Sequence, residues 1–206
     1  MKRSSFLISV IFLFCSQLTA AEIPDPETLE RLRSGEILLL EDDTRKEGGS
    51  ARGQAIVHAS AVAVWEVILS CEQKFTFVNG LKKCEVIEDA GDRALIHQVV
   101  KRSWTTPTVD FVYESLNDPY REIRFQLVEG NMRAMEGAWA FIETADGLLL
   151  DYRIRVQPAM SVPAFIVSSD LRKGMPDMIA CIRGLAGGSG STERSKGDLE
   201  RCAGNP

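Results

Sequence analysis

The sequence has 206 residues, of which 45% are hydrophobic, and a formal net charge of −5. This length supports one well-buried core and is too short for two ordinary domains joined by a linker. Lysine and arginine are scattered along the chain, so the sequence offers no basic face to a nucleic-acid backbone and nucleic acid is not an expected partner.

The first 21 residues have the pattern of an export signal. Lys2 and Arg3 precede an apolar run over residues 6–14, and small residues follow up to Ala20 and Ala21. The run is too short to span a bilayer, so we expect cleavage near Ala20 or Ala21. A periplasmic or secreted protein is the expected product, and an uncleaved membrane anchor is the alternative.

Four cysteines follow the predicted signal, and an oxidising compartment allows them to pair. Four cysteines have three possible pairings, of which the most local joins Cys71 to Cys84 and Cys181 to Cys202. Free buried thiols are the alternative, because cysteine is also a small core residue. The chain has no CxxC pair and two histidines, so we expect no metal site.

The first elements are predicted from capping residues. Asp25 and Pro26 mark a helix start, because aspartate caps the free amides and proline is preset for the first turn. Ser60 caps a second helix, which carries Trp65 on an apolar stripe. In chain order we expect a helix over 26–33, a strand over 36–41, a charged mobile loop over 42–52, a strand over 55–57 and a helix from 61 to about 70.

Six strands in meander order are predicted next, after a short helical turn within 74–80. In the last of them, Leu148, Leu150 and Tyr152 alternate with polar residues such as Asp151 and Arg153. One face of the resulting antiparallel sheet is therefore apolar and must be covered. The strands are expected over 82–88, 93–102, 109–116, 122–128, 132–143 and 148–157.

The cover is a long helix predicted over 163–185, where apolar residues recur at three- and four-residue steps. Pro176 lies inside this segment and removes a backbone donor, so we expect a kink there. The glycine-, serine- and charge-rich tail after residue 186 is predicted to be flexible unless Cys202 ties it back.

Four short stretches stand in this order of elements: Ile56-Val57-His58-Ala59-Ser60 leading into Val64-Trp65-Glu66-Val67-Ile68, the segment 75–83, Gly137-Ala138-Trp139-Ala140-Phe141, and Val162-Pro163-Ala164-Phe165. With them, the chain resembles the START-like (SRPBCC, helix-grip) superfamily, especially its polyketide cyclase and coenzyme Q-binding branch. Asn79-Gly80 departs from the pattern, because relatives often carry Met-Pro-Gly there.

The resemblance implies an α+β helix-grip fold, in which a curved antiparallel sheet wraps around the long C-terminal helix. The resulting division of the chain is a signal peptide over 1–21, an N-terminal extension over 22–52, a START-like ligand-binding domain over 53–186 and a flexible tail over 187–206.

The resemblance also implies that the protein binds, and transports or sequesters, a hydrophobic small molecule such as a lipid, sterol, quinone or isoprenoid. The ligand would occupy a cavity between sheet and helix, with no cofactor and with transient contact to a membrane. Each wall residue also fits a plain core position. The expected wall consists of Trp139, Phe141, Tyr152, Tyr113, Phe165 and Met175, with His97 as a polar contact.

A cyclase/aromatase-like or hydrolytic enzyme is the alternative function. The sequence contains no GxSxG, HExxH, phosphate-loop or GxGxxG motif. His97, which shares its strand face with Leu95 and Val99, is the best candidate acid or base. An interaction module that acts through residues 22–52 is a third hypothesis.

Overall fold

The computed structural model describes residues 24–40, 48–102, 104, 107–160, 162–187 and 193–202. The predicted signal over 1–21 and the first part of the predicted loop over 42–52 lie outside the described residues. Within the described part of the chain, no helix combines the length and the apolar character needed to cross a bilayer.

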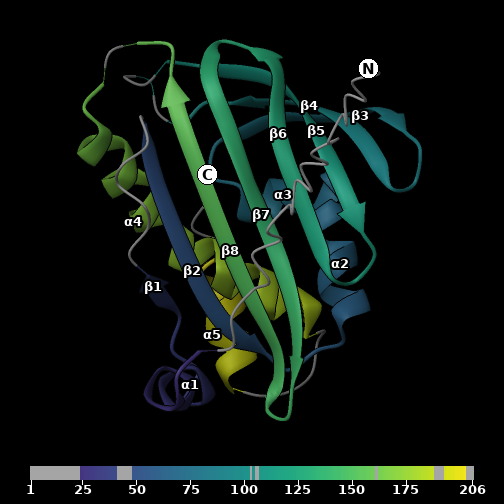
Figure 1. Ribbon diagram of the computed structural model, residues 1–206, viewed down its shortest axis with the longest axis vertical. Helices are drawn as coiled ribbons and strands as arrows, with labels where there is room; N and C mark the ends of the chain where they lie inside the picture. The colour runs from purple at the N-terminus through teal and green to yellow at the C-terminus, as the bar shows by residue number, and fades with distance from the viewer. Residues whose placement is uncertain are drawn as a thin grey trace, which may run out of the picture.

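Eight strands form one curved antiparallel sheet in front of the main helices (Figure 1). Their order is β1-β2-β8-β7-β6-β5-β4-β3, so the last six strands follow one another as the predicted meander and β2 pairs with β8. The strands are β1 (Leu38–Leu40), β2 (Gly49–Val57), β3 (Leu81–Asp89), β4 (Arg93–Val100), β5 (Val109–Asp118), β6 (Glu122–Gly130), β7 (Met132–Thr144) and β8 (Gly147–Pro158).

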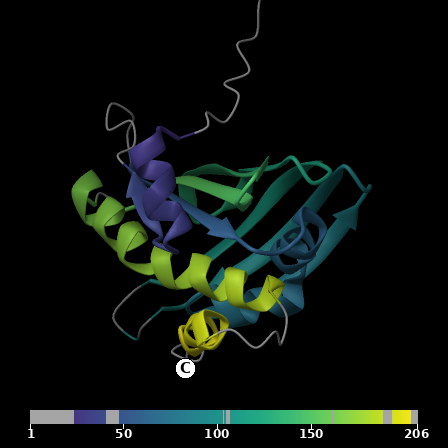
Figure 2. The ribbon, with the colours of Figure 1, turned by 90° about the horizontal axis from the view of Figure 1, so that it is seen from below.

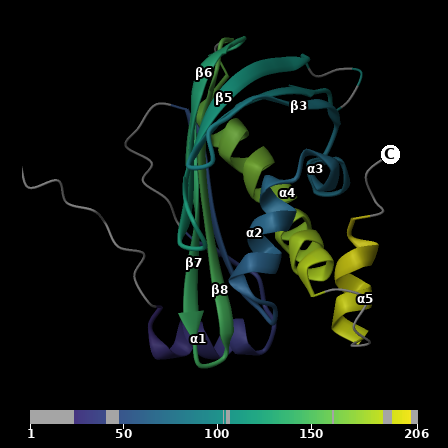
Figure 3. The same ribbon diagram turned by 90° about the vertical axis from the view of Figure 1, so that its right-hand side faces the viewer.

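The helices lie on both sides of this sheet. Figure 3 shows α2, α3 and α4 on the concave side, with α5 beyond α4, and α1 across the lower end of the sheet. Seen from below, α4 crosses the hollow of the sheet (Figure 2). The predicted helix-grip fold is therefore confirmed. The described helices are α1 (Pro26–Arg33), α2 (Ala61–Leu69), α3 (Cys71–Phe77), α4 (Ala164–Ala186) and α5 (Glu193–Glu200).

The long helix α4 packs along β2 because β2 presents small residues to it. A Cβ atom added to Gly53 would lie 2.7 Å from Sδ of Met175, and one added to Gly49 would lie 2.5 Å from the backbone nitrogen of Ser168. Neither position has room for a side chain, so the two glycines permit the close approach of helix and strand. The helix also continues through Pro176, and the kink predicted there stays a prediction.

The prediction of a loop up to residue 52 is wrong for residues 49–52, which belong to β2. They pair with β8, where Gly49 lies opposite Val156 and Arg52 opposite Arg153. The charge of Arg52 does not indicate a loop, because its guanidinium bonds to the buried carboxylate of Asp151 on the neighbouring strand, with Nε 3.0 Å from Oδ1.

Helix α1 begins and ends at the predicted residues and covers the outer face of the sheet. The side chain of Asp25 accepts hydrogen bonds from the backbone amides of Glu27 and Thr28, as expected of an N-cap. Its apolar contact is Leu32, which is fully buried in a cluster with Leu38, Ile56 and Leu149.

Residues 193–202 of the C-terminal tail are joined to α4, and Cys202 ties this part back. A disulfide joins Cys181 to Cys202, and the guanidinium of Arg183 makes two hydrogen bonds of 2.7 and 2.8 Å to the carboxylate of Asp198 on α5. Arg183 also donates to the backbone oxygen of Gly35, 3.1 Å away. This end of α4 is thereby linked to both ends of the described chain.

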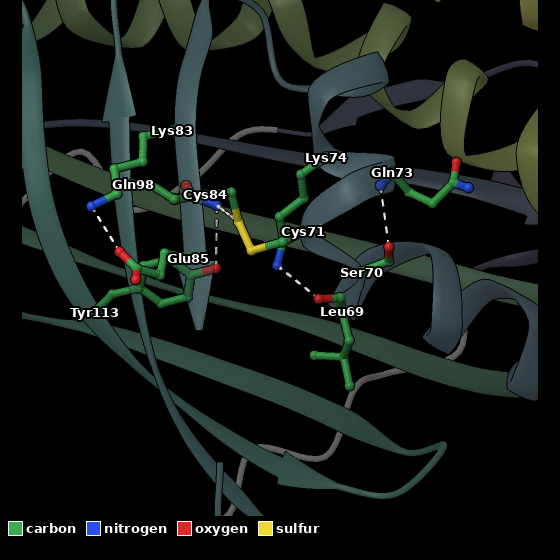
Figure 4. Close-up of a disulfide and its surroundings, with 10 residues drawn as sticks. All are labelled: Leu69, Ser70, Cys71, Gln73, Lys74, Lys83, Cys84, Glu85, Gln98 and Tyr113. Carbon is green, nitrogen blue, oxygen red and sulfur yellow. Dashed lines mark hydrogen bonds and ion pairs between the residues drawn. A yellow bond between two sulfur atoms is a disulfide. The ribbon is translucent and has the colours of Figure 1, made fainter. Parts of the chain in front are cut away.

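The second disulfide joins Cys71 of α3 to Cys84 of β3 (Figure 4). The most local of the three possible pairings is therefore the one formed. Helix α3 begins at Cys71, earlier than the predicted turn, because Ser70 caps it by accepting a hydrogen bond from the amide of Gln73. The bond fastens α3 over the concave face of the sheet.

Candidate functional site

The concave side of the sheet carries two clusters of buried apolar side chains, and Phe125 of β6 packs against both. The larger cluster lies under α2 and the second half of α4, and the smaller one lies under α3. Among its members the larger cluster includes Val64, Ile68, Phe77, Ile123, Trp139, Phe141, Leu150, Tyr152, Met175 and Ile179. The smaller cluster consists of Ala94, Ile96, Phe111, Tyr113 and Met135.

Four aromatic side chains form a row across this face, from β7 and β8 to β6 and β5. The rings of Trp139 and Tyr152 stack, with centroids 3.7 Å apart and planes inclined by 16°. The ring of Phe125 lies 6.3 Å from that of Tyr152 and 6.2 Å from that of Tyr113. The row therefore connects the larger cluster to the smaller one.

Gly137 of β7 allows Phe125 its place in the row. A Cβ atom at this position would lie 2.3 Å from Cζ of Phe125, so the ring lies directly over the glycine. In the sequence Gly137 stands between the aromatic Trp139 and Met135 on the same strand face. The gap in that apolar pattern is filled by a ring from the neighbouring strand.

Two tyrosines of the row are buried. Burial raises the pKa of both Tyr113 and Tyr152 above the ordinary range for tyrosine, and for Tyr152 the nearby Tyr113 adds to the effect while Arg102 opposes it. The Tyr113 hydroxyl lies 3.5 Å from the side-chain nitrogen of Gln98. The Tyr152 hydroxyl has no hydrogen-bond partner among the described residues, and its oxygen is not one of the fully buried side-chain atoms that lack a partner.

Five of the seven predicted wall residues come together on the concave side. Trp139, Tyr152 and Tyr113 belong to the aromatic row, and Met175 of α4 lies against β2 at Gly53. Phe141 packs against Trp65 of α2, with ring centroids 5.4 Å apart.

The other two predicted wall residues lie elsewhere. Phe165, in the first turn of α4, is 73% exposed and lines an open groove of about 800 Å³. The groove runs between α4 and the β1–β2 edge, outside the apolar clusters. Its other lining residues are Leu39, Gly48, Ser50, Ala164, Ser168, Ser169, Arg172 and Lys173.

His97 lies on the outer face of β4, opposite to its neighbours Ile96 and Gln98. One ring nitrogen, Nε2, is 2.7 Å from a carboxylate oxygen of Asp110, and the other is 3.1 Å from Nζ of Lys83. The three residues lie on β4, β5 and β3, on the face of the sheet opposite to the aromatic row. Among the described residues, no three His, Cys, Asp or Glu side chains are placed to share a metal ion.

Three residues of the interior were not among the predicted wall residues: Phe125, Gln98 and Lys74. The side chain of Lys74 is buried on α3, although lysine is a residue type expected at the surface. Ser70 is a good helix cap, and this signal would have predicted that the helix begins at Cys71. Lys74 would then lie on the same helix face as Cys71. Phe125 belongs to the alternating apolar residues of its strand, so the alternation indicates the correct face of the sheet. It does not indicate that the Phe125 ring lies over Gly137 of the neighbouring strand.

A family model described as polyketide cyclase/dehydrase and lipid transport matches residues 57–183, more than half of the chain. The comparison with curated proteins found no match.

Solved structures are similar in fold. A STAR-related lipid transfer protein from Xanthomonas axonopodis is 15% identical, with a TM-score of 0.59, and the match covers 73% of this chain and 98% of that one. A START superfamily protein from Mycobacterium smegmatis is 16% identical, with a TM-score of 0.54 and coverage of 64% and 94%. A di-domain ARO/CYC from the BE-7585A biosynthetic pathway is 11% identical, with a TM-score of 0.51 and coverage of 66% and 48%. The fold is START-like.

Proposed function

Because the chain belongs to the polyketide cyclase/dehydrase and lipid transport family, we propose that it binds an apolar small molecule between the concave face of the sheet and α4. The molecule is a lipid, sterol, quinone or isoprenoid, which the protein transports or sequesters. The wall consists of the aromatic row with Phe141 and Met175. Phe165 and His97 are left out of this wall, because one lies in the open groove and the other on the outer face.

The observation that carries the proposal is the pair of buried tyrosine hydroxyls in the aromatic row. A hydroxyl removed from water without a hydrogen-bond partner destabilises a fold by about 1–3 kcal/mol. Tyr113 has only a long contact to Gln98, and Tyr152 has no partner among the described residues, although its hydroxyl oxygen keeps some accessible surface. A bound molecule with an oxygen atom between these hydroxyls would satisfy them. Pockets of this kind are mostly apolar with a few convergent polar groups.

Entry to the interior lies at the end of the molecule where the β4–β5 and β8–α4 connections meet. An ion pair joins Arg102 of the β4–β5 connection to Asp170 of α4. Large apolar side chains of the two connections and of the first turn of α4 are exposed, which favours transient contact with a membrane. They are Trp104 at 91%, Met160 at 62%, Phe165 at 73% and Ile166 at 48%.

The two disulfides are compatible with a periplasmic or extracellular location, where such bonds persist. We propose that the chain reaches this location by cleavage of the signal near Ala20 or Ala21. The ligand would then be carried or held outside the cytoplasm. A cyclase or hydrolase that uses His97 is not part of this proposal, because its ring faces away from the aromatic row.

Native mass spectrometry of the protein purified from its own host tests the proposal. We expect an apolar molecule that co-purifies, is removed by solvent extraction and rebinds to the extracted protein. Tyr152→Phe should weaken rebinding about tenfold, since it removes one hydrogen bond while keeping the ring. The control Phe165→Ser should leave rebinding unchanged. Empty protein that binds no apolar probe would overturn the proposal, and a reversed order of the two variants would move the ligand to the open groove.

A further inference from the structure

Lys74 occupies an unusual position for a lysine, on the inner face of α3. Because the helix begins after the Ser70 cap, Cys71, Lys74 and Phe77 are one turn apart and share one face. Cys71 packs against the smaller apolar cluster and Phe77 belongs to the larger one. Lys74 therefore lies between the two clusters, with 7% of its surface exposed.

The ammonium group of Lys74 has less bonding than its burial requires. Nζ donates one hydrogen bond, 3.2 Å long, to the backbone oxygen of Leu69. A lysine ammonium has three N–H donors, and within the described residues the other two have no acceptor and no carboxylate is paired with the charge. A buried charge without a counter-ion destabilises the fold, so an anionic partner from outside the chain would stabilise this ammonium group.

Polar side chains with donor hydrogens lie on both sides of the Cys71–Cys84 disulfide, and the exposed carboxylate of Glu85 near it is paired with Lys83. Figure 4 shows Lys74 on one side of the disulfide, and Gln98 with Tyr113 on the other. The side-chain nitrogen of Gln98 lies 3.7 Å from the sulfur of Cys84 and 3.5 Å from the Tyr113 hydroxyl. The Gln98 nitrogen donates to both of these atoms, so the ammonium of Lys74 and the hydrogen of the Tyr113 hydroxyl are the donors left for an acceptor rich in oxygen.

The buried acidic side chains of the described chain lie elsewhere and already have partners. Asp151 is bonded to Arg52 on the outer face of the sheet, and Asp198 is bonded to Arg183 between α4 and α5. Neither can neutralise Lys74. The interior is therefore apolar, with the positive charge of Lys74 on one side of the disulfide and the Tyr113 hydroxyl on the other.

We propose that Lys74 binds the acidic end of the apolar ligand, so that the molecule carried is an amphiphile with an anionic oxygen group such as a carboxylate. This inference rests on the proposed function, because it concerns the same interior. The apolar part of the ligand lies along the aromatic row, and its carboxylate receives hydrogen bonds from Nζ of Lys74. Burial lowers the pKa of Lys74 to about 8, so the group is still charged at neutral pH and can pair with an anion.

The experiment compares oleic acid with methyl oleate, two probes that share the apolar chain and differ in the charge of the head group. Binding is measured by displacement of an environment-sensitive apolar dye from the purified protein. We expect the wild type to bind the acid at least tenfold more tightly than the ester. Lys74→Met should lower the affinity for the acid about ten- to a hundredfold, as for a charged hydrogen bond, and leave the affinity for the ester unchanged.

Lys82→Met is the matched control, since this lysine is exposed on β3. It should keep the preference of the wild type for the acid. Circular dichroism of each variant shows whether the fold is retained, and Lys74→Gln serves as a second substitution that keeps a donor without the charge. It should give the same loss of preference.

The outcomes separate the two proposals. Equal binding of acid and ester by the wild type, or an acid preference that persists in Lys74→Met, would refute the role of Lys74 and leave the proposed function standing. If the wild type binds neither probe nor any other apolar molecule, both proposals fail.

Discussion

Replacing Lys74 by methionine should make the unliganded protein more stable. Methionine has nearly the shape of the lysine stem and carries no charge, so Lys74→Met leaves the packing between the two apolar clusters in place. The pKa of this ammonium is lowered from 10.5 to about 8, and burial is the cause. A pKa lowered by this amount corresponds to about 3 kcal/mol of lost stability at pH 7.

The sign of the pH dependence follows from the same values. Because the folded-state pKa of Lys74 lies below that of the unfolded chain, the unfolded state binds more protons between pH 8 and 10.5. The destabilisation is complete below pH 8 and is lost as the pH rises through this window. The advantage of Lys74→Met should therefore fall from about 3 kcal/mol at pH 7 to about 1 kcal/mol at pH 9.5.

Urea unfolding followed by tryptophan fluorescence measures this difference, with the disulfides intact and the ligand extracted. Lys82→Met, which removes an exposed lysine, should change the free energy of unfolding by less than about 0.5 kcal/mol at either pH. A Lys74→Met protein that is less stable than the wild type, or whose advantage is the same at both pH values, would refute the reasoning that the ammonium is buried without a counter-ion.

Three further variants, two of them with a matched control, test the packing of the helices and the burial of the tyrosine hydroxyls. Gly53→Leu should destabilise the fold by about 1–3 kcal/mol in urea unfolding, because the new side chain pushes α4 off β2. The control Gly174→Ala lies on an open face of α4 and should be neutral or stabilising by up to about 1 kcal/mol. Asp198→Ala should lower the free energy of unfolding by about 3 kcal/mol, because it leaves the buried guanidinium of Arg183 without its carboxylate. The control Asp177→Ala breaks an exposed pair with Arg201 and should have a much smaller effect. Equal effects of the two substitutions would contradict this prediction. Burial raises the pKa of Tyr113 and Tyr152. Replacing both by phenylalanine should therefore leave the absorbance titration at 295 nm unaltered below pH 11. Loss of a titration step below this pH would show that the two tyrosine hydroxyls are accessible to water.

Much of the fold could be predicted because the relevant signals are local. The bounds of α1 follow from Asp25 and Pro26, and the six-strand meander follows from alternation and turn residues. The start of β2 was missed because Gly49 and Ser50 carry no alternation. Their place is decided by the approach of α4, which lies more than a hundred residues away in the chain.

The candidate site was harder to predict, since it depends on which face of each strand turns inward. Both faces of β4 are largely apolar, so the alternation of its residues does not indicate which face turns inward. The sequence therefore predicts that His97 shares a face with Leu95 and Val99 but not that this face is the outer one. Lys74 was not recognised from the sequence as a buried residue, because its burial arises from the packing of α3 over the sheet. The aromatic residues Trp139 and Tyr152 were found because both lie on strands with clear alternation.

Helix α4 is fastened very unequally along its length. Its buried side chains all lie at Met175 or beyond, and the Cys181–Cys202 bond and the contacts of Arg183 hold that end. The first half has no fully buried side chain and is held by the Arg102–Asp170 pair and by a hydrogen bond from the amide of Ser50 to the hydroxyl of Ser168. Because these contacts are fewer than those of the second half, bending of the first half would admit a ligand while the core under the second half stays intact. In hydrogen exchange, amides after residue 175 should remain protected for far longer than those of the first three turns.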